Sequence, residues 1–117
     1  MDEKELKQRT NDFAHRCVKL ALALPKGQLG NHIAGQLIRC STSVAANYRA
    51  TLMAQSKASF ISKLSIVLEE TDEAAFWLEF IVDEELMKQE LVEPLLEEAR
   101  ELTAIFYSSR KTARKQN

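Results

Sequence analysis

The segment that decides the fold is residues 57–85, KASFISKLSIVLEETDEAAFWLEFIVDEE, which contains neither glycine nor proline. Apolar and small side chains recur through it at intervals of three and four residues, at Phe60, Leu64, Val67, Leu68, Thr71, Ala75, Leu78 and Val82. In an α-helix this spacing aligns the side chains on one side. We therefore predict one long helix over about 57–85 whose apolar stripe faces a core.

Three further stripes with helical spacing flank this segment and predict helices over about 3–24, 29–53 and 91–112. In chain order, their members are Leu6, Phe13, Cys17, Leu20 and Leu24; Leu29, Ile33, Leu37, Cys40, Val44, Tyr48 and Leu52; and Leu91, Leu95, Ala99, Leu102 and Phe106. Short connections between helices favour antiparallel neighbours. The sequence therefore predicts an all-α, antiparallel up-down-up-down four-helix bundle, with residues 1–117 as a single domain.

Two helix boundaries carry less sequence signal. Ser56 is a candidate N-cap and suggests a break at 54–56, but neither glycine nor proline enforces it, and one continuous helix is the alternative. Pro94 suits the first turn of the last helix, where a missing N–H costs no hydrogen bond. We expect residues 110–117 to follow that helix as a polar, basic tail.

Composition limits the possible functions of this 117-residue chain. The formal net charge is −1, so no overall positive field draws the protein to nucleic acid, and any such binding is local. The first residues are charged and no apolar run approaches membrane-spanning length, which predicts a cytoplasmic protein with no membrane partner. Cys17 and Cys40 lie among apolar residues, and we expect both to be reduced and buried.

Residues 74–82, AAFWLEFIV, are apolar on almost every side of the predicted helix. Leu78 and Val82 can face the core, while Phe76 and Phe80 point away from it with Trp77 on a flank. An aromatic cluster exposed on a monomer would be adhesive. We therefore predict that Phe76, Trp77 and Phe80 form a homo-oligomer interface; the alternative is that loops or the end of the last helix cover them.

Polar residues form two ridges beside the core. Gln36, Arg39, Ser43 and Asn47 share one arc of the second helix, and Lys63, Glu70 and Glu73 form a similar arc on the third. They form either a ligand site between helices or a hydrogen-bonded seam that fixes packing, and the seam is favoured because no nucleophile-base pair is apparent.

We expect neither a catalytic residue, nor a metal, nor a cofactor. The paired Glu-x-x-His motifs of di-iron bundles are absent, and His15 and His32 lack a spaced ligand partner. The strongest basic cluster is Arg110, Lys111, Arg114 and Lys115. It either contacts nucleic-acid phosphates or complements the negative end of the helix dipole, and both interpretations stay open.

Three ordered motifs resemble the bacterial four-helix-bundle family encoded in 23S rRNA intervening sequences. They are QLIRCSTSVAANYR at 36–49, SKASFISKL at 56–64, and ETDE at 70–73 leading into FWLE at 76–79. The resemblance implies a ring, commonly a pentamer, without enzymatic activity. A related branch, the accessory variability determinants of diversity-generating retroelements, binds a reverse transcriptase and nucleic acid through basic surfaces.

The family motif falls on residues with structural or interaction roles, namely Arg39, Ser43, Asn47, Lys63, Glu70, Glu73 and Trp77. Many members carry an acidic residue where this chain has Ala50. Without that partner, we expect Arg39 to pair with Glu70 or Glu73.

The sequence thus favours a non-enzymatic oligomeric accessory protein that binds RNA, DNA or a nucleic-acid-processing enzyme such as a reverse transcriptase. The alternative is a protein-protein scaffold ring that makes no contact with nucleic acid.

Overall fold

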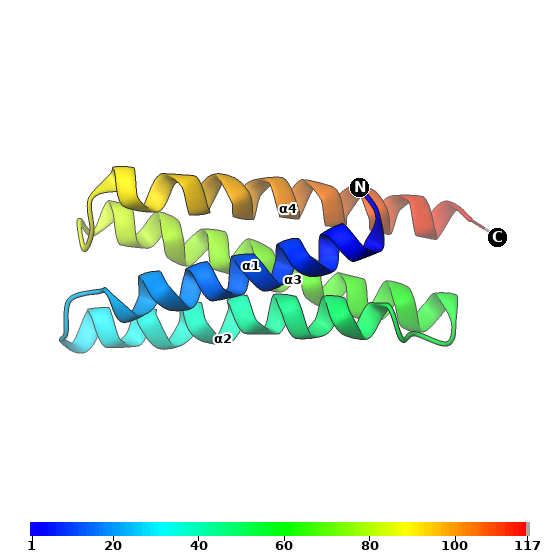
Figure 1. Ribbon diagram of the computed structural model, residues 1–117, viewed down its shortest axis with the longest axis horizontal. Coiled ribbons are helices and arrows are strands. Elements are labelled where there is room, and N and C mark those ends of the chain that lie inside the picture. The colour runs from blue at the N-terminus through cyan, green and yellow to red at the C-terminus, as the bar shows by residue number, and fades with distance from the viewer. Residues whose placement is uncertain (117) are drawn as a thin grey trace.

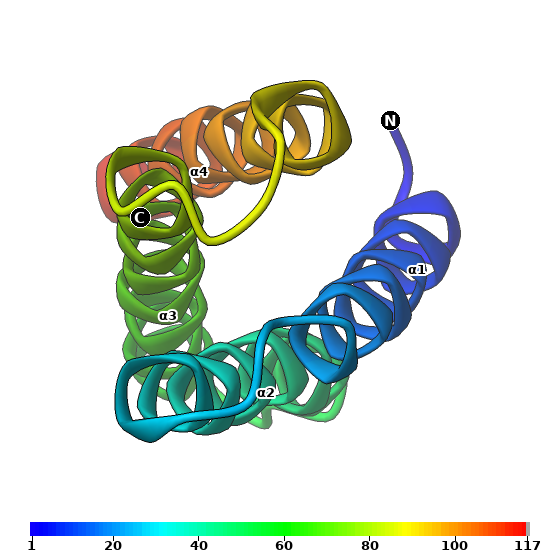
Figure 2. The same cartoon turned by 90° about the vertical axis from the view of Figure 1, so that its left-hand side faces the viewer.

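The computed structural model describes residues 1–116 and contains four α-helices (Figure 1). These are α1 (Glu3–Leu22), α2 (Gln28–Thr51), α3 (Lys57–Asp83) and α4 (Gln89–Lys115). Successive helices run in opposite directions, and the described residues contain no strand. Viewed along the bundle, the helices follow one another around a central core, with α1 and α4 the most widely separated neighbours (Figure 2). The predicted all-α four-helix fold is confirmed.

Side-chain caps mark the starts of α1 and α3. The Asp2 carboxylate accepts a hydrogen bond from the backbone N–H of Glu5 at 2.8 Å, and the Ser56 hydroxyl accepts one from Ser59 at 3.0 Å. Each cap satisfies an N–H that has no partner within the helix. The chain therefore breaks between Thr51 and Lys57, and the alternative of one continuous helix there is wrong.

A close approach fixes the connection between α1 and α2. A Cβ added at Gly30 would lie 1.9 Å from the carbonyl oxygen of Pro25, a distance that no side chain tolerates. Gly27, immediately before α2, has a φ of 139°, which favours glycine. These two glycines allow the chain to turn tightly against the first turn of α2.

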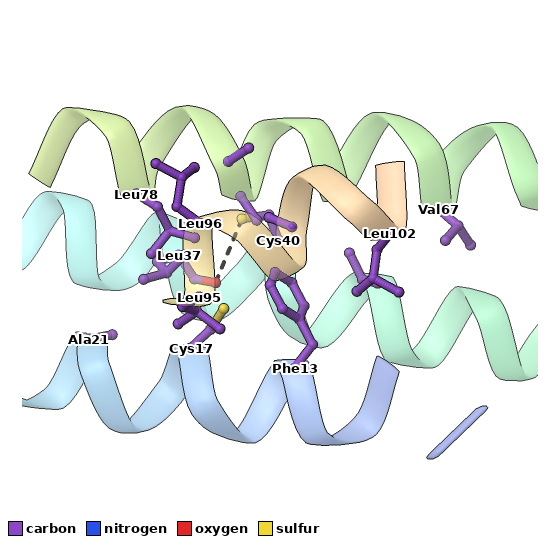
Figure 3. Packing of buried hydrophobic residues seen from close by; sticks show 14 of the residues in the cluster. Phe13, Cys17, Ala21, Leu37, Cys40, Val67, Leu78, Leu95, Leu96 and Leu102 are labelled. Atoms are coloured by element: carbon purple, nitrogen blue, oxygen red, sulfur yellow. Dashed lines mark hydrogen bonds between the residues drawn. The ribbon is translucent and has the colours of Figure 1, made fainter. Parts of the chain in front are cut away.

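The core contains most of the predicted stripe residues. Phe13, Cys17, Leu37 and Cys40 are fully buried, and Figure 3 shows the two cysteines among leucines from the other helices. Both cysteines are free thiols, as expected. In α3 the residue buried at the end of the stripe is Ile81, whereas Val82, expected there, is only partly buried.

The start of α4 differs from the expectation in two ways. Leu91 was expected in the core but is 63% exposed, because Val92, about 100° further around the helix, faces inward instead. The helix begins at Gln89, so Pro94 is its sixth residue and lies beyond the first turn. Its nitrogen has no hydrogen to donate to the carbonyl of Glu90, and the expected location in the first turn is wrong.

The end of α4 also differs from the expectation. The helix continues to Lys115, so the basic cluster is helical and is not an irregular tail. Ala113 is buried within this last stretch, which indicates that these turns pack against the rest of the bundle. Asn117, the last residue of the expected tail, lies outside the described residues.

Candidate functional site: a basic end and an aromatic patch

Four cations lie together on the last two turns of α4. Arg110, Lys111, Arg114 and Lys115 are spaced so that they share one side of the helix, and together with Tyr107 they line a cavity of about 250 Å³. Arg110 donates a hydrogen bond through Nη1 to the hydroxyl of Ser65 on α3 at 3.3 Å, while the other three cations are exposed. The predicted basic residues thus form one continuous surface.

This surface belongs to two segments of the chain that contain no carboxylate side chains. Residues 49–68 and 102–116 together hold seven lysines and arginines and no aspartate or glutamate. The end of α2, the start of α3 and the end of α4 lie at the same end of the bundle (Figure 1). We call this set the basic end; it consists of Arg49, Lys57, Lys63, Arg110, Lys111, Arg114 and Lys115.

The rest of the α3–α4 hairpin has the opposite charge. Residues 69–101 hold thirteen aspartates and glutamates but only Lys88 and Arg100 as cations. The start of α1, which lies toward the basic end, carries both signs. The net charge of −1 therefore conceals a strong separation of charge, because residues 13–68 hold seven lysines and arginines and no carboxylate, while residues 69–101 are strongly acidic. The uneven distribution of charged residues is visible in the sequence, but only the antiparallel arrangement of the helices shows that the two acid-free segments lie together.

Phe76, Trp77 and Phe80 form an aromatic patch on α3. The ring centroids of Phe76 and Trp77 are 4.9 Å apart, and those of Trp77 and Phe80 are 6.0 Å apart. His32 of α2 meets the Trp77 ring edge-on at 5.5 Å. Phe76 is 51% exposed, so residues 1–116 leave the patch open to solvent. The end of α4 lies at the other end of the bundle and does not cover it.

A polar network joins the aromatic patch to α2. Arg39 pairs with Glu70 at 3.1 Å and also with Glu73, and its Nε donates to Gln36 at 3.2 Å. The Glu73 carboxylate accepts a further hydrogen bond from the Trp77 indole N–H at 3.1 Å. Arg39 therefore pairs with both glutamates that the sequence offered as alternatives.

The pKa of Glu73 reflects this network. Partial burial acts to raise it, but the hydrogen bonds from Arg39 and Trp77 outweigh burial and hold the pKa below its ordinary value. The same hydrogen bond, from the other side, raises the pKa of Arg39. Both groups are charged at neutral pH, and the network holds the indole ring in a fixed orientation.

The remaining residues of the polar ridges lie apart from this network. The Asn47 side-chain amide donates to the backbone carbonyl of Ser43 at 3.0 Å and to its hydroxyl at 2.9 Å, an interaction within one helix. Lys63 is two turns before Glu70 and belongs to the basic end. The two predicted ridges are therefore not one continuous seam.

Sequence reasoning missed a second arginine cluster, between α1 and α4. Arg9 forms two hydrogen bonds of 2.7 Å with the Glu98 carboxylate and a weaker contact of 3.3 Å with Glu101. The Arg9 and Glu98 side chains are only 22% and 15% exposed. No local pattern signals this pair, because its members are 89 residues apart.

An apolar groove opens where α1 and α4 diverge. It has a volume of about 380 Å³ and is lined by Arg16, Lys19, Leu20, Ala23, Met87, Leu91, Pro94 and Leu95. Leu91, the residue expected in the core, is the most exposed leucine on its rim. Its lining suits an apolar side chain or the apolar face of a helix.

The described residues show little reactive chemistry. Burial raises the pKa of Cys40 to about 12 and that of Cys17 further still, so both thiols stay protonated and inert. Within residues 1–116, no group of three His, Cys, Asp or Glu side chains is placed to hold a metal ion. None of the four helices has a stretch long and apolar enough to cross a membrane.

Comparison with known proteins places this bundle among relatives. A crystal structure of a protein with unknown function from the S23 ribosomal protein family of Bacteroides thetaiotaomicron is 33% identical, with a TM-score of 0.86. The match covers 95% of this chain and 99% of the other. No curated protein matches the chain. The model of the family described as 23S rRNA-intervening sequence protein matches residues 2–108, and the chain belongs to that family.

Proposed function

We propose that the protein is a non-enzymatic, self-associating accessory factor of the cytoplasm that binds RNA or DNA through its basic end. In this role it assists a nucleic-acid-processing enzyme, for which a reverse transcriptase is the candidate that the related retroelement proteins suggest. The observation that carries the proposal is the basic end itself, with seven cations and no carboxylate on its two segments.

The absence of carboxylates matters because phosphates must compete for the cations. Arg9, Arg39 and Arg100 each pair with glutamates, which neutralise their charge within the protein. Arg110 instead donates to a neutral hydroxyl, and Lys111, Arg114 and Lys115 are exposed beside it. A phosphate that binds here releases counterions and displaces no ion pair among residues 1–116. This favours a polyanion as the ligand of the basic end.

Self-association would strengthen such binding. The aromatic patch offers an apolar surface for another copy, and each added copy contributes another basic end, so a weak individual site becomes an avid one. The family resemblance suggests a homopentamer. In that arrangement the Arg39 network serves the interface, because it orients Trp77 within the patch.

The test is the salt dependence of binding to a structured RNA, with a four-residue variant, Arg110→Gln, Lys111→Gln, Arg114→Gln and Lys115→Gln. Glutamine keeps the helix but removes the charge. We expect affinity at low salt to fall at least ~10-fold, and the dependence of log K on log salt to become shallower by about 3, if all four cations meet phosphates.

A matched control removes four exposed cations from the opposite end of the bundle, by Arg16→Gln, Lys19→Gln, Lys26→Gln and Lys88→Gln. This variant has the same net charge as the first, and we expect it to bind nearly as well as the wild type. Equal losses in both variants, or no binding by the wild-type protein at low salt, would refute the proposed function.

The α1–α4 groove favours a second candidate, a scaffold ring that binds protein and no nucleic acid. Its apolar lining and the exposed Leu91 suit a partner helix. The discriminating experiment is a pulldown after nuclease treatment. A single protein partner that is lost with Leu91→Asp and retained with the basic-end variant would favour the scaffold; the reverse pattern would favour nucleic-acid binding.

A further inference from the structure

We infer that Tyr107 makes the basic end a site for unpaired nucleotides, with its ring stacked on a base while the neighbouring cations hold the adjoining phosphates. The inference rests on the proposed function and makes it more specific, since it selects single-stranded over double-stranded nucleic acid.

The exposure of Tyr107 comes from its place on a well-packed helix. Its neighbour Phe106 is fully buried and packs against Tyr48 with ring centroids 5.6 Å apart. Because successive helix residues differ by about 100°, this anchored neighbour turns Tyr107 away from the core. The Tyr107 side chain is 56% exposed, so an aromatic ring is held in solvent by the packing behind it.

The cations lie on the same side of α4 as this ring. Tyr107, Arg110, Lys111, Arg114 and Lys115 line one cavity, at spacings of three, four, seven and eight residues. These spacings place the charges about 5 to 12 Å beyond the ring along the helix axis. The aromatic ring therefore lies at one edge of a positive surface, next to the groups that would hold a strand.

This combination fits an unpaired strand better than a duplex. An exposed aromatic ring beside basic side chains is the usual means of binding single strands, because every base offers a flat face for stacking. In a duplex those faces are covered by neighbouring base pairs, and only phosphates and groove edges are accessible. A duplex would use the four cations but would leave Tyr107 without a partner.

The experiment compares two labelled RNA probes with equal numbers of phosphates, an unstructured uridine-rich oligonucleotide and a blunt duplex, by fluorescence anisotropy at low salt. The proteins are the full-length wild type, Tyr107→Ala, Tyr107→Phe and Tyr107→Leu. We expect Tyr107→Ala to weaken single-strand binding by about 5- to 100-fold and duplex binding by less than ~2-fold. Tyr107→Phe should bind like the wild type, and Tyr107→Leu should bind like the alanine variant.

The controls separate this inference from the proposed function. Thermal melting followed by circular dichroism should be the same for all four proteins, because the side chain is exposed. If the wild type binds both probes and Tyr107→Ala changes neither, or changes both equally, stacking is refuted and the proposed function stands. Stacking is also refuted if Tyr107→Leu binds the single strand as tightly as the wild type. If the wild type binds neither probe, both the inference and the proposed function are wrong.

Discussion

Arg9 joins α1 to α4 through Glu98 and Glu101, whereas Arg39 joins α2 to α3 through Glu70 and Glu73. Arg9 is 22% exposed and meets Glu98 with two short hydrogen bonds; Arg39 is 48% exposed. Their surroundings differ as well. The α1–α4 pair has the least contact among neighbouring helices, while α2 and α3 pack closely (Figure 2).

This difference teaches that similar ion pairs serve different purposes. Arg9 links two helices with little other contact, so its hydrogen bonds contribute to holding the bundle closed. Arg39 links helices that are already held by their core, so its main effect is on Glu73 and, through Glu73, on Trp77. We therefore assign stability to the Arg9 cluster and the shape of the aromatic patch to the Arg39 network.

The largest effect is expected from Phe76→Asp, which places a charge in the aromatic patch. Because Phe76 is half-exposed, the fold should survive while the proposed self-association is lost, and light scattering should report the mass of a monomer. Leu22→Asp is the matched control, since Leu22 is also an exposed apolar residue. An unchanged mass for Phe76→Asp would show that assembly does not use the patch.

Next in size is Arg9→Ala, which removes the pair between α1 and α4. The Glu98 side chain, only 15% exposed, loses two charge-assisted hydrogen bonds, so the free energy of unfolding should fall by about 2 kcal/mol in urea titrations. Arg100→Ala, which breaks only exposed contacts, should change it by less than ~0.5 kcal/mol. Equal losses in the two variants would contradict the role given to Arg9.

A smaller change in stability is expected from Arg39→Ala. The loss should stay below ~1 kcal/mol, because the arginine is largely exposed and its ion pairs are screened by water. Self-association should weaken several-fold all the same, since Glu73 no longer holds the indole in a fixed position. If Arg39→Ala instead lost as much stability as Arg9→Ala and left self-association unchanged, the roles assigned to the two arginines would be wrong.

The smallest effect is a pH dependence from Glu73. Its pKa is lowered in the folded protein, so its contribution to stability is complete above the ordinary value of 4.5 and is lost as the pH falls through the folded pKa. The difference in urea midpoint between the wild type and Glu73→Gln should therefore be greatest at neutral pH and shrink below pH 4.5. A difference that grows in acid would contradict the lowered pKa.

The fold was predictable because helical periodicity is a local property of sequence. The stripes through Phe13, Leu37 and Leu78 identify three helices and their buried sides without knowledge of the packing. The start of α4 was harder, because Leu91 and Val92 are adjacent apolar residues and Lys88 gives no side-chain cap to mark the boundary. Only the packing of α4 against the other helices decides which of these two aliphatic side chains faces the core.

The candidate site was predictable only in part. The aromatic patch and the cations of 110–115 are clusters of residues close together in sequence, so the sequence alone identifies them. The pairing of Arg39 was expected from the family resemblance. The Arg9–Glu98 pair depends on the rotation and register of two helices that are distant in sequence. Tyr107 could be assigned to the basic end only from the structure, because the buried Phe106 determines which side of α4 faces solvent.

The separation of charge also determines how the molecule would approach a nucleic-acid strand. The bundle measures 49 × 20 × 20 Å, and the acidic stretch 69–101 occupies the α3–α4 side away from the basic end. If the molecule lay lengthwise on that side, its carboxylates would face the phosphates and be repelled. If the protein binds nucleic acid as proposed, a strand would therefore avoid the acidic α3–α4 side. It would lie across the basic end, where the bundle is 20 Å wide, or along the adjoining stretch 13–68, which holds seven cations and no carboxylate.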